Sequence, residues 1–198
     1  MSSTPMSQTK VFLIHGFEGS PNGGWRPYVM GELQRQEIYT CALPMPNPEA
    51  PELDAWLNEV DRVVKRCPED DIYLIGHSLG GTAILRYLEA KEHENIRGII
   101  LVSTPCSPTA NKAIDEFLSR PFDWAHLQRL AIPCVVVHGD NDPLVPLADA
   151  RHITDKLNAE LHIIPDGKHL NGSAGFTQLP TVVAALMRLT MQKKPQLS

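Results

Sequence analysis

Short runs of consecutive apolar residues recur along the chain, and each of them is too short to form a helix. Runs of this kind, without alternation of apolar and polar positions, are typical of parallel strands that are covered on both faces. We expect strands at residues 10–14, 72–75, 98–102, 133–137 and 161–164, with a weaker candidate at 38–42.

Longer segments with apolar residues three or four positions apart lie between these runs, and this spacing is typical of amphipathic helices. They occupy residues 53–64, 78–90, 147–157 and 181–189. Alternation of strands and helices indicates βαβ units. The pattern therefore predicts an α/β fold, in which helices flank a mainly parallel sheet of about six strands.

The length of 198 residues fits one domain. We expect this domain to span residues 10–191, because the chain shows no internal repeat and no low-complexity block. The polar ends, residues 1–9 and 192–198, are expected to be short mobile tails.

The segment from Ser103 to Leu130 breaks the alternation of strands and helices. It contains three prolines and the aromatic residues Phe117, Phe122 and Trp124, but no clear strand. It follows the carboxyl end of a predicted strand, which is where ligands bind in open α/β sheets. The segment either roofs a pocket or closes the core with its aromatic residues, and the sequence leaves both interpretations open.

Charge and hydropathy narrow the classes of function. Eighteen basic residues against 23 acidic residues give a net charge of −5, which argues against nucleic acid as a partner. No apolar run approaches the roughly 20 residues of a membrane span. Residues 1–9 lack the apolar core of a signal peptide, so we expect a cytoplasmic protein.

The four cysteines stand far apart and form no C-x-x-C pair. A zinc site needs such pairs, or histidines at set spacing, so we expect reduced, packed thiols and no metal.

The segment 71–82 carries the strongest chemical signal. It contains the pattern G-x-S-x-G as Gly76, His77, Ser78, Leu79 and Gly80, preceded by a predicted strand and followed by a predicted helix. This strand–turn–helix context is the one that a nucleophile elbow requires. The elbow predicts Ser78 as a nucleophile, with glycines where the tight turn leaves no room for side chains.

A nucleophilic serine needs a base that is oriented by a third group. Asp142 lies in the loop after the strand at 133–137, and His169 lies in the loop after the last predicted strand. We predict a triad of Ser78, Asp142 and His169. Asp140 is the rival acid, and we expect it to brace the turn.

Two other histidines receive different interpretations. We expect His162, inside the last strand, to pack, and His152, on a helix, to lie at the surface.

An oxyanion hole needs two backbone donors near the nucleophile. One is expected from the amide of Leu79 and the other from the loop after the first strand, where we assign the Phe17 amide with Gly16 as the rival. We expect His15 to fix this loop rather than to act as a base.

These motifs resemble those of the α/β-hydrolase superfamily over nearly the whole chain. A narrower likeness adds to this. The segments 16–21, 44–48 and 121–124, with Trp25, Pro27 and Leu33, are similar to the small retinoblastoma-binding-protein-nine type serine hydrolases. The resemblance implies a compact domain without a large lid, with Ser78, Asp142 and His169 as its triad.

One feature of that group is missing. The mammalian member is linked to the retinoblastoma protein through an L-x-C-x-E segment, and no cysteine here has that surrounding pattern. We therefore expect no retinoblastoma-type partner.

The sequence predicts a serine hydrolase without a cofactor, a carboxylesterase acting on small carboxylic esters. The alternative is a non-catalytic or weakly active interaction protein on the same scaffold, because fold alone does not determine function. The predicted substrate pocket draws on His15, Gly16, Phe17, Trp25, Phe117, Phe122 and Trp124.

Overall fold

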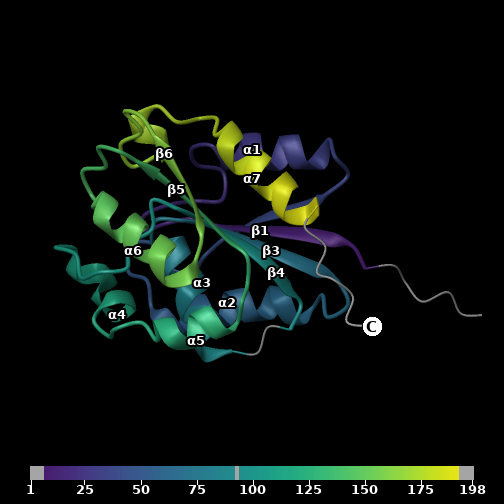
Figure 1. Ribbon diagram of the computed structural model, residues 1–198, viewed down its shortest axis with the longest axis horizontal. Coiled ribbons are helices and arrows are strands. Elements are labelled where there is room, and N and C mark those ends of the chain that lie inside the picture. The colour runs from purple at the N-terminus through teal and green to yellow at the C-terminus, as the bar shows by residue number, and fades with distance from the viewer. Residues whose placement is uncertain (1–6, 92–93, 192–198) are drawn as a thin grey trace, which may run out of the picture.

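A six-stranded parallel sheet forms the centre of the computed structural model, which describes residues 7–91 and 94–191 (Figure 1). Its spatial order is β2-β1-β3-β4-β5-β6. The strands are β1 (Thr9–Ile14), β2 (Tyr39–Leu43), β3 (Asp71–His77), β4 (Ile96–Val102), β5 (Cys134–Gly139) and β6 (Glu160–Ile164). The predicted parallel α/β architecture is confirmed. Residues 1–6 and 192–198 of the predicted tails lie outside the described residues.

Seven α-helices flank the sheet in the described part of the chain. They are α1 (Arg26–Gln34), α2 (Leu53–Lys65), α3 (Leu79–Ala90), α4 (Asp115–Leu118), α5 (Trp124–Arg129), α6 (Leu147–Leu157) and α7 (Pro180–Met191). Two short 3₁₀ helices, η1 (Lys112–Ile114) and η2 (Gly172–Ala174), lie in loops. Helices α1 and α7 cover one face of the sheet, and the other five lie on the opposite side (Figure 1).

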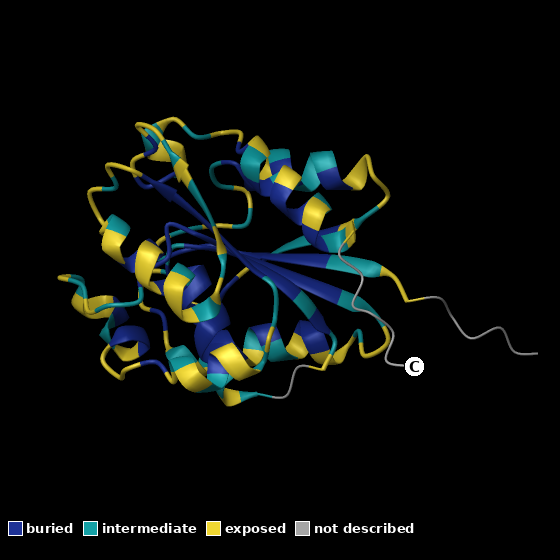
Figure 2. Cartoon of the chain, in the orientation of Figure 1, coloured by how far each residue is buried: buried dark blue, intermediate teal, exposed yellow. Residues whose placement is uncertain are grey.

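The strands separate two apolar cores, which explains their continuous apolar sequences. In β1, Val11 and Leu13 pack under α1 and α7, whereas Phe12 and Ile14 pack on the side of α2 and α3. Figure 2 shows the buried residues concentrated along the central strands. Because both faces of the sheet are covered, residues that point to either face of a central strand are buried. Apolar and polar positions therefore do not alternate along these strands.

Strand β6 departs from this pattern because it lies at one edge of the sheet and pairs only with β5. Ile163 is 39% exposed. His162 was expected to pack, but its side chain lies half-exposed and contacts the Glu160 carboxylate at 2.6 Å. An apolar run in a strand therefore does not by itself show that both faces are covered.

Helix α1 was not predicted, because its pattern is weak. Within it the buried side chains are only Arg26, Val29 and Leu33. Pro27 stands in its first turn, where the missing N–H costs nothing. Helices α4 and α5 are too short for a periodic signal.

The segment 103–130 combines both interpretations that the sequence left open. Its first part, near η1, lines a cavity described below. Its second part packs in the core, where Phe117 is fully buried and meets Trp56 edge to face at 5.6 Å. The buried Arg86 guanidinium holds this part, since it stacks on the Phe122 ring at 3.6 Å and donates to the Phe117 carbonyl.

The remaining expectations concern thiols, metal, membrane and charge. All four cysteines are free thiols, as predicted.

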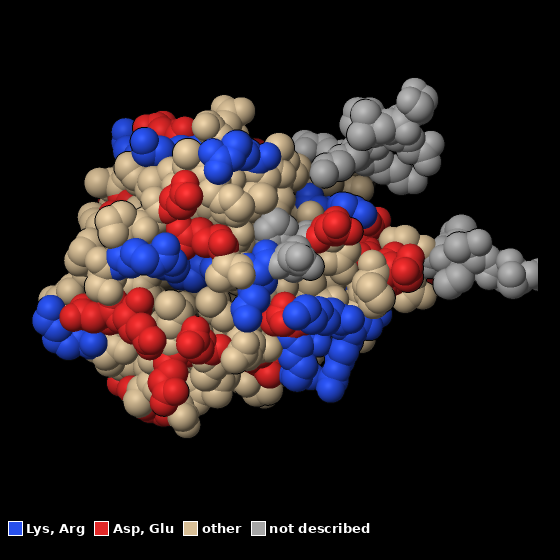
Figure 3. Space-filling view, turned by 90° about the horizontal axis from the view of Figure 1, so that it is seen from below, with Lys and Arg blue, Asp and Glu red and all other residues tan. Residues whose placement is uncertain are grey.

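Within residues 7–91 and 94–191, no helix is long and apolar enough to span a bilayer, and no cluster of His, Cys, Asp and Glu could hold a metal ion. On the face seen in Figure 3, acidic and basic side chains are interspersed, so this face has no basic stripe for phosphates.

The glycines of the fold provide a stability test with a matched control. A methyl group at Gly80 would collide with the Ile14 carbonyl oxygen, whereas Gly31 in α1 has open space around its Cα. We expect Gly80→Ala to lower the free energy of unfolding by about 2 kcal/mol or more. Gly31→Ala should raise it by about 0.5–1 kcal/mol. Urea unfolding of both variants measures the two effects, and an unchanged midpoint for Gly80→Ala would contradict the close approach.

Candidate active site

Ser78 occupies the tight turn between β3 and α3. Its backbone has φ 54° and ψ −123°, a combination that a residue with a Cβ seldom adopts. The turn is held by hydrogen bonds from the Ser78 amide to the Val102 carbonyl at 2.8 Å and from the Gly81 amide to the Ser78 carbonyl at 2.9 Å. A Cβ at Gly76 would collide with the backbone of Gly81. The local strain thus depends on glycines on both sides of the turn.

His169 and Asp142 meet from two loops that follow neighbouring strands. Asp142 lies between β5 and α6, and His169 lies after β6. The His169 Nδ1–H donates to Asp142 Oδ2 at 2.8 Å. The Asp142 carboxylate is fully buried and the His169 side chain is 8% exposed. Since parallel strands end at one edge of the sheet, both groups lie at the same edge as Ser78.

Three donors keep the Asp142 carboxylate ionised. Burial alone would raise its pKa, but hydrogen bonds from His169 and from the amides of Val145 and Leu144 outweigh burial and lower the pKa below its usual value. The two amides donate to Oδ1 at 3.0 and 2.8 Å, which leaves Oδ2 for the imidazole. The carboxylate is therefore fixed in orientation as well as in charge.

Asp140 contacts the loop that carries His169 but not its ring. Its Oδ1 accepts a hydrogen bond from the Asp166 amide at 2.9 Å. The neighbouring Asn141 adds two contacts, accepting from the Lys168 amide at 2.8 Å and donating to the Asp166 carboxylate at 2.7 Å. The structure thus brings Asp142 rather than Asp140 to the histidine, and Asp140 braces the loop.

His77 is hydrogen-bonded to the loop that carries His169. Its Nε2–H donates to the His169 carbonyl at 3.0 Å, and its ring meets Trp25 edge to face at 5.9 Å. Burial, with a smaller contribution from the nearby His169, lowers the pKa of His77 to about 3. His77 is therefore neutral at pH 7 and acts as a hydrogen-bond donor of fixed tautomer.

His15 is buried and holds the loop after β1. Its Nδ1–H donates to the Gly16 carbonyl at 2.8 Å, and its Nε2 accepts from the Met45 amide at 3.3 Å. Both ring nitrogens are thereby used, and burial lowers its pKa. These contacts fit a brace for the loop rather than a base.

The predicted oxyanion donors lie beside Ser78. A Cβ at Gly16 would lie 2.9 Å from Ser78 Cβ, so the backbone after β1 closely approaches the serine. Within the described chain, neither the Phe17 nor the Leu79 amide donates to a protein acceptor. Both N–H groups are therefore available to a ligand.

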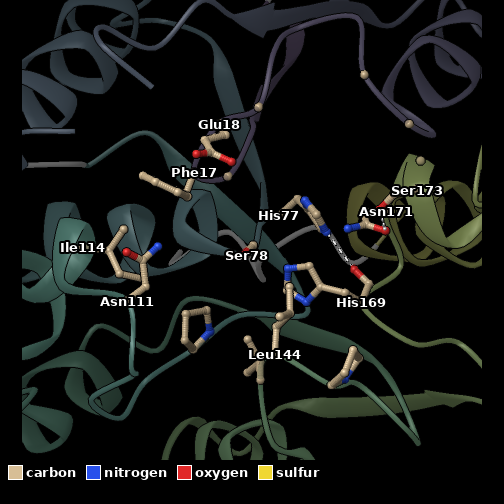
Figure 4. A pocket seen from close by; sticks show the side chains of 18 of the residues that line it. Phe17, Glu18, His77, Ser78, Asn111, Ile114, Leu144, His169, Asn171 and Ser173 are labelled. Carbon is tan, nitrogen blue, oxygen red and sulfur yellow. Dashed lines mark hydrogen bonds between the residues drawn. The ribbon is translucent and has the colours of Figure 1, made fainter. Parts of the chain in front are cut away.

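A cavity of about 670 Å³ joins these elements, a size in the usual range of small-molecule sites. Ser78 and His169 both line it, and Figure 4 shows the His169 ring close to Ser78. In the described structure, Ser78 Oγ makes no hydrogen bond to this ring; such contacts commonly tighten only when substrate is bound. The serine and the imidazole thus both face the same cavity.

Comparison with protein families matches a serine hydrolase model over residues 11–188. The chain belongs to the serine hydrolase family. YdeN of Bacillus subtilis strain 168 is 32% identical over 180 residues, covering 89% of this chain and 94% of YdeN. Serine hydrolase RBBP9 of Rattus norvegicus is 27% identical over 186 residues, covering 91% of this chain and 97% of the rat protein.

Solved structures place this serine hydrolase in the α/β-hydrolase fold. The crystal structure of the ydeN gene product of B. subtilis superimposes with a TM-score of 0.85 at 28% identity, covering 93% of this chain and all of that chain. Est1E from Butyrivibrio proteoclasticus gives a TM-score of 0.75 at 20% identity, covering 95% and 89%, which supports the fold alone. The predicted fold and family resemblance are confirmed, and no large lid is present in the described residues.

The predicted pocket of this serine hydrolase needs correction. Gly16, Phe17 and Trp25 line the cavity, but Phe117, Phe122, Trp124 and His15 do not. The three aromatic residues instead pack in or against the core; the Trp124 ring meets the exposed His152 at 5.3 Å. Burial of the large apolar surface of these rings in the core outweighs a position in the pocket wall.

Sequence reasoning missed most of the remaining walls. These are Glu18, Ser20, Arg26, Pro105, Thr109, Asn111, Ile114, Leu144, Asn171 and Ser173, together with neighbouring residues of the same loops. They share one signal, since each belongs to a segment that follows the carboxyl end of a strand. No sequence pattern distinguishes them from other loop residues.

The buried histidines predict how stability depends on pH. Burial lowers the pKa of His15, His77 and His138 in the folded state. As pH falls below about 6.5, the unfolded chain binds protons that the folded chain does not, so stability decreases. Each histidine adds a slope approaching about 1.4 kcal/mol per pH unit.

Urea unfolding between pH 7 and pH 5 measures this slope. We expect His77→Gln to reduce it, because the glutamine amide can still donate to the His169 carbonyl but does not titrate. His152→Gln, at an exposed position, is the matched control and should keep the wild-type slope. Equal slopes in wild type and His77→Gln would show that folding does not lower the pKa of His77.

Proposed function

We propose that this serine hydrolase is a carboxylesterase that cleaves small carboxylic esters through an acyl-enzyme on Ser78. The observation that carries the proposal is the 2.8 Å hydrogen bond from His169 Nδ1 to the buried Asp142, beside a cavity that Ser78 and His169 both line. This arrangement leaves His169 Nε2 as the free acceptor on the cavity side. A neutral imidazole with its other nitrogen tied to a carboxylate has the tautomer that a general base needs.

In the first half-reaction, Ser78 Oγ attacks the ester carbonyl carbon while its proton moves to His169 Nε2. The carbonyl electron pair moves onto oxygen and forms a tetrahedral oxyanion. The Phe17 and Leu79 amides donate to that oxygen. When the intermediate collapses, the bond to the alcohol oxygen breaks, and the His169 imidazolium gives its proton to that oxygen. The alcohol leaves and the acyl group remains on Ser78.

Water completes the cycle by the same steps. His169 Nε2 takes a proton from water, and the resulting hydroxide oxygen attacks the acyl carbon. The second oxyanion collapses as the bond to Ser78 Oγ breaks, and His169 returns a proton to that oxygen. The carboxylic acid leaves, and the serine and the neutral imidazole are restored.

Electrostatics favours both transition states. The ionised Asp142 stabilises the imidazolium that forms at His169, because the two groups are in contact and shielded from solvent. Helix α3 begins at Leu79, so the positive end of its dipole lies next to the developing oxyanion. Charge of each sign therefore develops beside a fixed charge or dipole of the opposite sign.

The walls nearest Ser78 support an apolar group beside the scissile carbonyl. Phe17, Ile114 and Leu144 supply apolar surface around the serine (Figure 4), and no lid extends the cavity in the described residues. The cytoplasmic location and the lack of a nucleic-acid or retinoblastoma-type partner remain predictions from sequence.

The nucleophile is tested by replacing Ser78. We expect Ser78→Ala to lower the turnover of p-nitrophenyl acetate and butyrate by about 10³-fold or more, since it removes the attacking oxygen. A fluorophosphonate probe should label wild type and fail to label Ser78→Ala. If wild type neither turns over these esters nor reacts with the probe, the interaction-protein hypothesis replaces the proposed function.

The two aspartates provide a matched pair for the acid. Asp142→Asn should lower kcat by about 10³–10⁴-fold, because an amide no longer fixes the imidazole tautomer. Asp140→Asn keeps an oxygen that accepts from the Asp166 amide, so its kcat should stay close to wild type. Steady-state kinetics of both variants on p-nitrophenyl butyrate makes the comparison. Equal losses in the two variants would assign Asp142 a bracing role only.

A further inference from the structure

Arg26 is a buried cation in the wall of the candidate active-site cavity. It lies at the start of α1, is 6% exposed and lines the cavity that Ser78 and His169 share. Its Nε–H and one Nη2–H donate to the Ser20 carbonyl, at 3.0 and 2.8 Å. Among the described residues, no carboxylate lies within ion-pair distance of its guanidinium. The proposed function makes no use of this charge.

A buried positive charge without an acidic partner is unfavourable in a folded protein. Burial lowers the pKa of Arg26 to about 10, and no neighbouring anion offsets that effect. The guanidinium therefore remains charged at pH 7 but lacks a counterion within the described protein. Buried arginines in proteins are normally paired, so this one has capacity for a ligand of opposite charge.

The N–H groups of Arg26 that do not bind Ser20 are arranged so that a carboxylate can accept two hydrogen bonds from them. A guanidinium carries five N–H groups, and the Ser20 carbonyl takes two of them. Both Nη1–H groups and the second Nη2–H remain. One N–H from each of these two nitrogens forms the end-on fork that binds a carboxylate through two parallel hydrogen bonds.

The surroundings of Arg26 supply polar groups to the cavity. The loop before α1 packs against the loop after His169, because Trp25 Nε1–H donates to the Leu170 carbonyl at 2.8 Å and Gly24 contacts Gly172. That second loop contributes Asn171 and Ser173 to the cavity, and both lie across Ser78 from Ile114 in Figure 4. The loops around Arg26 thus place hydrogen-bonding groups in the same cavity wall as the guanidinium.

Glu18 is the acidic residue in this lining, and it does not neutralise Arg26. It makes no ion pair with Arg26 in the described structure, and Figure 4 shows it beside Phe17, away from Asn171 and Ser173. Its amide donates to the Pro48 carbonyl at 2.8 Å. Glu18 and Arg26 therefore both line the cavity without forming an ion pair in the described structure.

We propose that Arg26 binds a carboxylate on the substrate, so that the preferred substrates are esters whose acyl chain ends in a carboxylate. Such half-esters of short dicarboxylic acids place the scissile carbonyl at Ser78 and the free carboxylate at Arg26. This inference rests on the proposed function. Arg26 is assigned as a specificity-determining residue, and the reacting atoms stay with Ser78 and His169.

A purely structural role for Arg26 makes a different prediction. If Arg26 only holds the Ser20 carbonyl, its replacement affects every substrate equally, because the loop after β1 moves for all of them. If Arg26 also binds a carboxylate, its replacement lowers the rate for anionic esters more than the rate for neutral ones. The ratio of the two rates separates the roles, whatever loss they share.

The experiment compares esters that differ only in charge. Monoethyl succinate, glutarate and adipate are each paired with the ethyl ester whose far carboxylate is a neutral carboxamide, and ethanol release gives kcat/KM. At pH 7 wild type should prefer at least one half-ester over its amide partner by about tenfold or more. The net charge of −5 works against this preference, so it must arise within the cavity.

The variants are Arg26→Gln, Arg26→Lys and Arg35→Gln. Arg26→Gln should lower the preference by about tenfold or more, and Arg26→Lys should keep part of it, because the charge remains without the fork. Arg35 carries the same charge just after α1 but is exposed and paired with Glu32. Arg35→Gln should therefore keep the wild-type ratio.

Each other outcome overturns the inference. Wild type that shows no preference for any half-ester excludes a carboxylate site, and this comparison needs no variant to fold. If Arg26→Gln still reacts with a fluorophosphonate at Ser78 but loses kcat/KM equally on the charged and the neutral ester, Arg26 only holds the loop after β1. If wild type hydrolyses p-nitrophenyl butyrate but neither type of ethyl ester, the substrate class is wrong while the proposed function stands. If Ser78 is inert to the probe as well, both fall together.

Discussion

The close approach of the β3–α3 turn to the end of β1 is the constraint on which the site depends. Gly80 lies against the Ile14 carbonyl with no space for a side chain, and Gly16 also approaches Ser78, though less closely. This contact brings the loop after β1 next to Ser78 and the start of α3. Under the proposed function, two amides from distant parts of the chain donate to one oxyanion there. The unfavourable backbone geometry of Ser78, which costs about 1–3 kcal/mol, is maintained by this packing.

A second set of contacts fixes the loop that carries His169. Asp166, Lys168 and Leu170 all have positive φ, so this loop is strained along its length. Hydrogen bonds from the 166 and 168 amides to the loop after β5 hold it, and His77 holds the His169 carbonyl. The imidazole position thus depends on Asp140 and Asn141, which contact only its loop, and on His77, whose ring also meets the His169 ring at 5.1 Å. Buried histidines that stay neutral suit this purpose, because protonation would change their donor pattern.

Sequence patterns predicted those parts of the molecule that have a strong local cause. The continuous apolar strands, the helices predicted at 53–64 and 78–90, and the glycines around Ser78 all follow from burial or steric limits that are visible locally. The pairing of Asp142 with His169 followed from the order of strand ends. Helix α1 was missed because its buried set includes Arg26 and few apolar residues. The pocket walls were missed because Asn111, Leu144 and Asn171 meet only in the folded chain.

The charge of Arg26 acts on its side of the cavity without an acidic partner in the described residues. Its field lowers the pKa of both His15 and His77, the larger cause in each case being burial. Under the proposed assignment, a substrate carboxylate supplies the missing countercharge, whereas a neutral ester leaves the guanidinium buried and unpaired. Because this ion pair forms when the substrate binds and persists in the transition state, it acts on substrate binding and lowers KM.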